Sequence, residues 1–91
     1  MSGTLEVELV TRRGCHLCDT ALAMLERASE DIPLRLVVRD VDADADLHAR
    51  YDWRVPVVLA GGREVAEGVI TPLALRDALR AAAEAGPPVG P

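Results

Sequence analysis

The chain has 91 residues, a formal net charge of −5 and a hydrophobic fraction of 49%. A chain of this length forms one domain with a single core, and we assign residues 1–91 to that domain. The negative charge argues against a nucleic-acid partner, because phosphate backbones attract basic proteins.

Hydropathy and cysteine usage point to a cytoplasmic protein without a membrane partner. No stretch of the sequence approaches the roughly 20 consecutive apolar residues of a membrane-spanning helix. Residues Met1 to Glu8 lack the basic region and the apolar run of a secretory signal peptide. In a reducing compartment, two cysteines are more typical of a catalytic or metal-binding pair than of a permanent cross-link.

The N-terminal half has the pattern of a strand, a helix and a second strand. From Thr4 to Val10, apolar residues alternate with polar ones, which is the period of a strand with one buried face. Strand composition returns at Leu34 to Val38. Between these segments, a helix from His16 to about Ser29 is predicted by apolar residues at helical spacing: Leu17, Ala21, Met24, Leu25 and Ala28. A strand–helix–strand unit of this length predicts parallel pairing through a right-handed crossover.

An aspartate occupies every second position between Asp40 and Asp46, which is similar to the start of a calcium-binding loop. Such a loop needs glycine at its sixth position and glutamate at its twelfth, whereas counting from Asp40 gives Ala45 and Tyr51. We therefore interpret Asp42 or Asp44 as the N-cap of a short helix from Asp46 to Tyr51.

The C-terminal half predicts a hairpin and a final helix. A strand from Val55 to Leu59 begins near a proline, and Gly61-Gly62 predicts a turn into a short antiparallel strand from Arg63 to Ala66. Thr71-Pro72 supplies the N-cap and the first-turn proline of the last helix. Residues 86–91 are expected to form a flexible tail.

The two cysteines, Cys15 and Cys18, are separated by two residues at the predicted start of the first helix. This spacing allows a disulfide to close across one helical turn and to open again. Cys15 precedes the first full turn and is expected to be exposed, whereas Cys18 lies on the apolar side. The positive end of the helix favours a Cys15 thiolate, and the cationic side chains of Arg12, Arg13 and His16 are expected to act in the same direction. We also assign these three residues to the substrate-binding surface.

We therefore predict a thiol–disulfide oxidoreductase. In this reaction Cys15 attacks a substrate disulfide, and Cys18 resolves the mixed disulfide that forms.

The order of predicted elements resembles the glutaredoxin branch of the thioredoxin superfamily. The segments that carry the resemblance are Arg13-Gly14-Cys15-His16-Leu17-Cys18, residues 51–57 and Gly61-Gly62. The resemblance implies an α/β, thioredoxin-like fold of the glutaredoxin type, βαβαββα, in which a four-stranded mixed sheet is flanked by three helices. It also implies a cis Val55–Pro56 peptide bond that faces the cysteines, with the backbone of Val55 holding the substrate as an added strand.

The same resemblance implies glutathione as a possible co-substrate of the reaction, with no cofactor bound to the protein. Arg12 occupies the position of a basic residue that binds glutathione in the family, and Val55-Pro56 supplies a second contact. Val69-Ile70 replaces the acidic pair that the family carries after the glycine at Gly68. This departure leaves open whether glutathione or a thioredoxin-reductase system reduces the protein, and whether its substrate is a disulfide-containing protein or a low-molecular-weight thiol.

Two other classes stay open at this point, although we expect a monomer without a metal site. The two thiolates could join an iron–sulfur cluster shared between two chains, whereas structural zinc needs four ligands, which the sequence does not supply. Alternatively, the chain is a non-catalytic binding module that uses the surface from Trp53 to Pro56.

Overall fold

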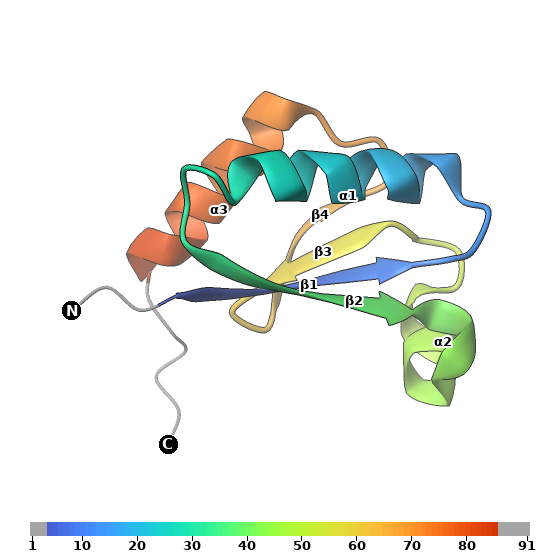
Figure 1. The fold of residues 1–91 in the computed structure, drawn as a ribbon. Helices are drawn as coiled ribbons and strands as arrows, with labels where there is room; N and C mark the ends of the chain where they lie inside the picture. Colours follow the sequence, from blue (N-terminus) through green and yellow to red (C-terminus); the bar gives the residue numbers. More distant parts are fainter. Residues whose placement is uncertain (1–3, 86–91) are drawn as a thin grey trace, which may run out of the picture.

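The computed structural model describes residues 4–85, which form a four-stranded sheet and three α-helices (Figure 1). The elements are β1 (Leu5–Thr11), α1 (His16–Ala28), β2 (Leu34–Asp40), a 3₁₀ turn (Val41–Ala43), α2 (Ala45–Tyr51), β3 (Val57–Ala60), β4 (Arg63–Glu67) and α3 (Pro72–Ala85). None of the helices in this part of the chain is long and apolar enough to cross a membrane. The predicted tail, residues 86–91, lies outside the described residues.

The strands lie in the order β2-β1-β3-β4. β1 runs parallel to β2, with Leu5 opposite Leu34, and antiparallel to β3, with Val10 opposite Val57. β3 and β4 form an antiparallel hairpin. The mixed sheet and the βαβαββα order are those expected from the sequence, and the parallel β1–β2 pair confirms the predicted pairing.

The β3–β4 hairpin depends on its two glycines. Gly61 and Gly62 have φ angles of 60° and 82°, a backbone region that residues with a Cβ rarely adopt. Positive φ at both central residues is the requirement of a type I′ turn, whose twist matches that of the flanking strands. The Gly-Gly pair therefore fixes the register in which Ala60 faces Arg63.

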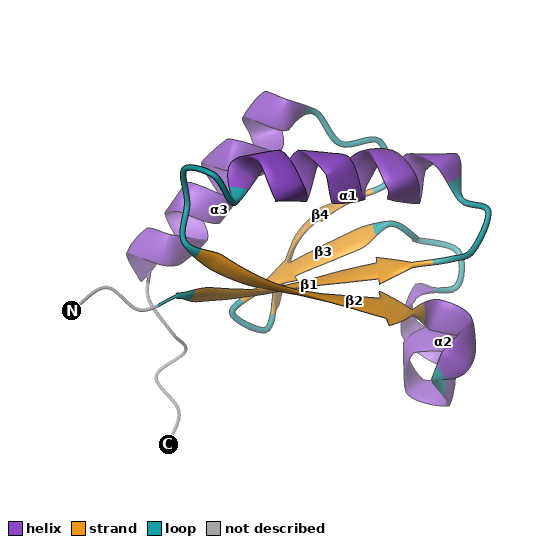
Figure 2. Cartoon of the chain, viewed as in Figure 1, coloured by secondary structure: helices purple, strands orange, loops and turns teal. Residues whose placement is uncertain are grey.

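The main core lies between the sheet and the two longer helices, α1 and α3, which cover the same face (Figure 2). Val7 and Leu9 of β1 are fully buried in this core with Leu25 of α1 and Leu79 of α3. Successive strand side chains point to opposite faces, so Glu6 and Glu8 lie on the other side. There Glu8 accepts a hydrogen bond from Arg39 Nε at 2.8 Å. The predicted one-sided burial of β1 therefore holds from Leu5 to Leu9, whereas Val10, on the same face as Glu8, is also fully buried.

A second, smaller core anchors α2 at the end of the sheet. Val10, Val41, Tyr51 and Val57 form this cluster and are all buried. The loop from β1 to α1 leaves the sheet at this end, and β3 enters it here (Figure 1). The first strand residue, Leu5, and the end of α3 lie at the opposite end of the sheet.

The aspartate-rich segment forms caps. Asp44 is the N-cap of α2, and its Oδ1 accepts hydrogen bonds from the N–H groups of Asp46 and Leu47 at 2.9 and 3.1 Å. Asp40 accepts a hydrogen bond from the N–H of Asp42 at 2.9 Å and so starts the 3₁₀ turn. Of the two N-cap candidates for the short helix, Asp44 is confirmed.

Several expected boundaries and burials need correction. β3 begins at Val57, not at Val55, because the Val55–Pro56 peptide precedes the paired residues. Leu17 is 41% exposed although it was expected on the buried stripe. The buried residues of α1 are Cys18, Ala21, Leu25 and Ala28. Leu17 lies at the edge of this stripe, about 40° around the helix from Ala21, in the first helical turn.

Candidate active site

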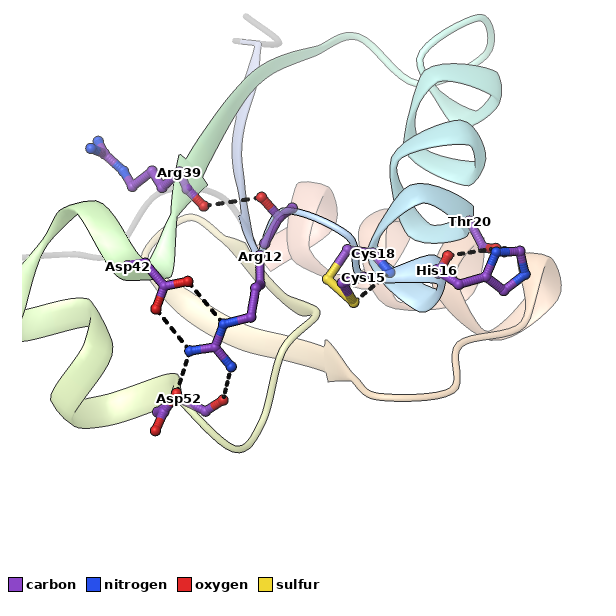
Figure 3. The surroundings of a disulfide bond; sticks show 9 residues. Arg12, Cys15, His16, Cys18, Thr20, Arg39, Asp42 and Asp52 are labelled. Carbon is purple, nitrogen blue, oxygen red and sulfur yellow. Dashed lines mark hydrogen bonds and ion pairs between the residues drawn. A yellow bond between two sulfur atoms is a disulfide. The ribbon is translucent and has the colours of Figure 1, made fainter.

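Cys15 and Cys18 form a disulfide at the start of α1, with their Cα atoms 5.1 Å apart (Figure 3). Cys15 is the N-cap of the helix, and its Sγ accepts a hydrogen bond from the N–H of Cys18 at 3.1 Å. The first N–H groups of a helix have no partners within the helix. The sulfur of Cys15 therefore takes the place that a serine or aspartate oxygen usually occupies.

The two cysteines differ in their access to solvent. Cys18 is 2% exposed and belongs to the buried stripe of α1, whereas Cys15 is partly exposed. This is the asymmetry that the helical spacing predicts. A substrate approaching from solvent would meet the sulfur of Cys15 first.

The loop before the disulfide is closed by a backbone hydrogen bond from the N–H of Cys15 to the C=O of Arg12 at 3.2 Å. Gly14 has a φ of 77°, and a Cβ built on it would meet no atom within 4 Å. The backbone conformation, rather than a lack of space, therefore favours glycine at this position.

The Val55–Pro56 peptide bond is cis, as the family resemblance implies. Pro56 is buried, and its C=O accepts a hydrogen bond from the N–H of Gly68 at 2.9 Å. Within residues 4–85, the backbone of Val55 makes no hydrogen bond with another backbone group. Because Val10 pairs with Val57, this peptide lies at the same end of the sheet as the disulfide loop.

The side chain of Arg12 points away from the disulfide (Figure 3). Its Nε and Nη2 donate to the carboxylate of Asp42, both at 2.9 Å, and its Nη1 donates to the C=O of Asp52 at 3.1 Å. Nη2 also contacts the carboxylate of Asp52. The hydrogen bond with Arg12 holds the pKa of Asp42 below its ordinary value of 3.8, and the same bond raises the pKa of Arg12. The structure thus brings Arg12 into ion pairs, where the sequence suggested a free cation.

Of the other two residues predicted to act on Cys15, Arg13 lines a hollow with Cys18, whereas the ring of His16 points away from the disulfide (Figure 3). Arg13 and His16 are both exposed, and within the described part of the chain no ion pair to Arg13 is found. The C=O of His16 accepts a hydrogen bond from Thr20 Oγ1 at 3.1 Å. A surface hollow of about 310 Å³ borders Arg13, Cys18 and Val38. A ligand in this hollow would lie beside the buried cysteine.

Arg54, next to the cis peptide, makes contacts that the sequence did not predict. The guanidinium of Arg54 lies 5.3 Å from the centre of the Tyr51 ring and donates to Glu67 through Nε at 3.1 Å. It also contacts Glu64, and the hydrogen bond from Arg54 holds the pKa of Glu67 below its ordinary value of 4.5. Trp53, by contrast, is 95% exposed. Trp53 and Arg54 directly precede Val55 in the sequence.

Asp42, His48 and Asp52 form a cluster whose ligand atoms lie within 4.8 Å of one another, a spacing that could suit a metal ion. His48 Nε2 lies 3.4 Å from Asp52 Oδ1. The two carboxylates of this cluster already bind the guanidinium of Arg12. A metal ion would therefore have to displace an existing cation.

Comparison with known proteins places the chain in a family. The model of the glutaredoxin-like domain (DUF836) matches residues 6–81. The chain belongs to this glutaredoxin-like family. Uncharacterized proteins of Mycobacterium bovis and Mycobacterium tuberculosis are 38% identical to it over 64 residues. The match covers 65% of this chain and 66% of each relative, which is just under two thirds of the relative's length.

Solved structures show the same fold as this glutaredoxin-like chain. Protein XcR50 from X. campestris is 34% identical, with a TM-score of 0.70 over 82% of this chain and 96% of its own. Protein Ne2328 from Nitrosomonas europaea is 25% identical, with a TM-score of 0.72 over 82% and 91% of the two chains. A mutant thioredoxin from Halobacterium salinarum, 24% identical, has a TM-score of 0.68 over 89% and 76% and shows the thioredoxin fold.

Proposed function

We propose that this glutaredoxin-like protein is a thiol–disulfide oxidoreductase with Cys15 as the nucleophile and Cys18 as the resolving thiol. The observation that carries the proposal is the position of the disulfide. Its partly exposed sulfur caps a helix, and its buried partner lies one turn further along. The N–H of Cys18 and the positive end of α1 favour negative charge on Cys15 once the disulfide is reduced.

The reaction has two exchange steps. The thiolate of Cys15 attacks one sulfur of a substrate disulfide, forms a mixed disulfide and releases the other substrate sulfur as a thiolate. The thiolate of Cys18 then attacks the Cys15 sulfur, which re-forms the Cys15–Cys18 disulfide and releases the second substrate thiolate. Two electrons pass to the substrate, and an external dithiol or two monothiols must return them.

The substrate edge is proposed at Val55. Its backbone groups have no backbone partners within residues 4–85, so an extended substrate segment can pair with them as an added strand. Arg13 and His16 are the sequence neighbours of the disulfide loop, Trp53 closely precedes Val55, and all three side chains are exposed. These features suit a disulfide-containing polypeptide at least as well as a low-molecular-weight disulfide.

The residues around the site support one source of electrons over the other. Arg12 is engaged by Asp42 and Asp52, and Val69, at the position of the family's acidic pair, is an 80% exposed apolar side chain. Of the groups expected to hold glutathione, Arg12 is thus paired with aspartates, and the acidic pair is replaced by apolar residues. We propose that a thioredoxin-reductase system reduces the protein faster than glutathione does. The rate of NADPH oxidation in a coupled assay, measured with each reductant in turn, tests this proposal.

Trapping of the mixed disulfide tests the proposed roles of the two cysteines. Cys18→Ser should accumulate a covalent adduct with a disulfide-bonded peptide, visible by mass spectrometry and removed by dithiothreitol. Cys15→Ser is the matched control and should form no adduct, because its remaining thiol is buried. Full turnover by Cys18→Ser without an adduct would refute the resolving role of Cys18.

The alternatives have separate readouts. A cluster shared between two chains would give visible absorbance after anaerobic purification and a dimer in size-exclusion chromatography. A binding module would keep its partner after both cysteines are changed to serine. The cytoplasmic location stays a prediction, which cell fractionation tests. The monomeric state also stays a prediction, which the same chromatography tests.

A further inference from the structure

Arg12 connects the two halves of the candidate active site. Its C=O accepts the N–H of Cys15 at 3.2 Å, in the loop that carries the reactive sulfur. Its Nη1 donates at 3.1 Å to the C=O of Asp52, which opens the turn leading to Val55-Pro56. Its Nε and Nη2 donate to Asp42, in the 3₁₀ turn that follows β2. One side chain therefore joins three segments that are separate in sequence.

The geometry of these bonds fixes the guanidinium in place. Nε, Nη1 and Nη2 all donate to protein acceptors, and the pair with Asp42 is bidentate (Figure 3). A planar fork held by two aspartates has little freedom to turn toward a ligand. Two carboxylates also offset its charge, so its field at the Cys15 sulfur is weak.

We propose that Arg12 is a positioning residue, which sets where the Cys15 loop lies relative to the Val55–Pro56 edge and neither binds the substrate nor activates Cys15 by its charge. The inference rests on the proposed function, because it concerns how a bound disulfide is aligned with Cys15. A misplacement of about 1 Å can lower a reaction rate about 100-fold, so a residue that fixes this spacing has a measurable effect.

The test compares Arg12→Gln and Arg12→Lys with Arg39→Gln. Arg39 pairs with Glu8 at 2.8 Å on the neighbouring strand, and its loss removes a similar exposed ion pair outside the site. We expect Arg12→Gln to lower kcat/KM for a disulfide-bonded peptide about tenfold or more. Arg12→Lys should show the same loss, because lysine keeps the charge but lacks the fork. Arg39→Gln should stay within about twofold of the parent protein, as a surface change does.

The pKa of Cys15, followed by the ultraviolet absorbance of the thiolate, separates positioning from charge. Positioning predicts the parental pKa in both Arg12 variants. Parental activity in Arg12→Lys, or a raised Cys15 pKa that accounts for the loss in Arg12→Gln, would assign Arg12 to charge and overturn the inference. Asp52→Asn keeps the backbone acceptor and serves as the milder variant if Arg12→Gln does not fold; its kcat/KM should also fall.

Amide chemical shifts show, without an activity assay, whether Arg12 links the Cys15 loop to the Val55 edge. Arg12→Gln should move the amide resonances of both Cys15 and Val55, whereas Arg39→Gln should move neither. If the parent protein reduces no disulfide, the proposed oxidoreductase function fails, but this comparison still measures the link between the two segments. Unchanged resonances at Val55 in Arg12→Gln would overturn the positioning role.

Discussion

Neighbouring residues of the disulfide loop have very different surroundings. Cys15 is partly exposed and Cys18 is buried, although one helical turn separates them. Arg12 is held by two aspartates, whereas Arg13, the next residue, is exposed. The spacing of the cysteines predicted the first contrast, because burial follows the helical period. No local pattern could predict the second, because the partners of Arg12 lie 30 and 40 residues away.

Trp53 provides a prediction at the residue scale. Its side chain is 95% exposed, so Trp53→Ala should change the free energy of unfolding by less than about 0.5 kcal/mol. Because the residue flanks the proposed substrate edge, the variant should raise KM for a disulfide-bonded peptide and leave KM for a small disulfide such as hydroxyethyl disulfide unchanged. Equal losses with both substrates would contradict a docking role for Trp53. Urea denaturation and steady-state kinetics provide the measurements.

At the scale of elements, the apolar periodicity was the strongest guide. Together with the turn and cap residues, it predicted all four strands and all three α-helices in their order, with boundaries that differ by at most two residues. The prediction of burial was less accurate for exposed apolar residues. Periodicity alone cannot tell that Leu25 is buried and Leu17 is exposed, because both leucines fit the same helical face. The register of the sheet decides which of them meets a strand, and that register involves residues far apart in the sequence.

Helix α3 allows a matched comparison of two leucines. Leu79 is fully buried in the main core, whereas Leu73 in the same helix is 75% exposed. We expect Leu79→Ala to lower the free energy of unfolding by about 2–5 kcal/mol, because it removes apolar contacts and leaves a cavity. Leu73→Ala should change it by less than about 0.5 kcal/mol. Similar effects of both variants in urea denaturation would show that α3 does not pack as described.

At the scale of the whole molecule, two arginine-centred networks join distant segments to the cis-proline region. Arg12 connects the disulfide loop to Asp42 and Asp52, and Arg54 connects the turn before Pro56 to β4. The fold and the cis peptide followed from the order of motifs and the family resemblance. The networks did not, since they depend on side chains that meet only once the sheet has formed.

These networks predict how stability changes with pH. Hydrogen bonds from Arg12 and Arg54 lower the pKa values of Asp42 and Glu67 in the folded protein. A carboxyl group of this kind adds stability above its unfolded-state pKa and loses that contribution as pH falls through its folded-state pKa. The free energy of unfolding should therefore decrease as pH is lowered from about 5 to about 2.

The double variant Asp42→Asn/Glu67→Gln measures the part of this decrease that the networks cause. It should be less stable than the parent protein at pH 7 and should show a flatter pH profile in urea denaturation. High salt should reduce the difference, because the pairs are exposed to solvent. A pH profile identical to that of the parent protein would exclude these two groups as its source.

The placement of Leu5 and the end of α3 has a practical consequence. Both lie at the end of the sheet opposite the β1–α1 loop (Figure 1). A label, fusion partner or gold surface attached near either of these points would leave Cys15 facing outward. Immobilised in this way, the protein would present its disulfide to an electrode-coupled or optical assay in one orientation, as a redox sensor requires.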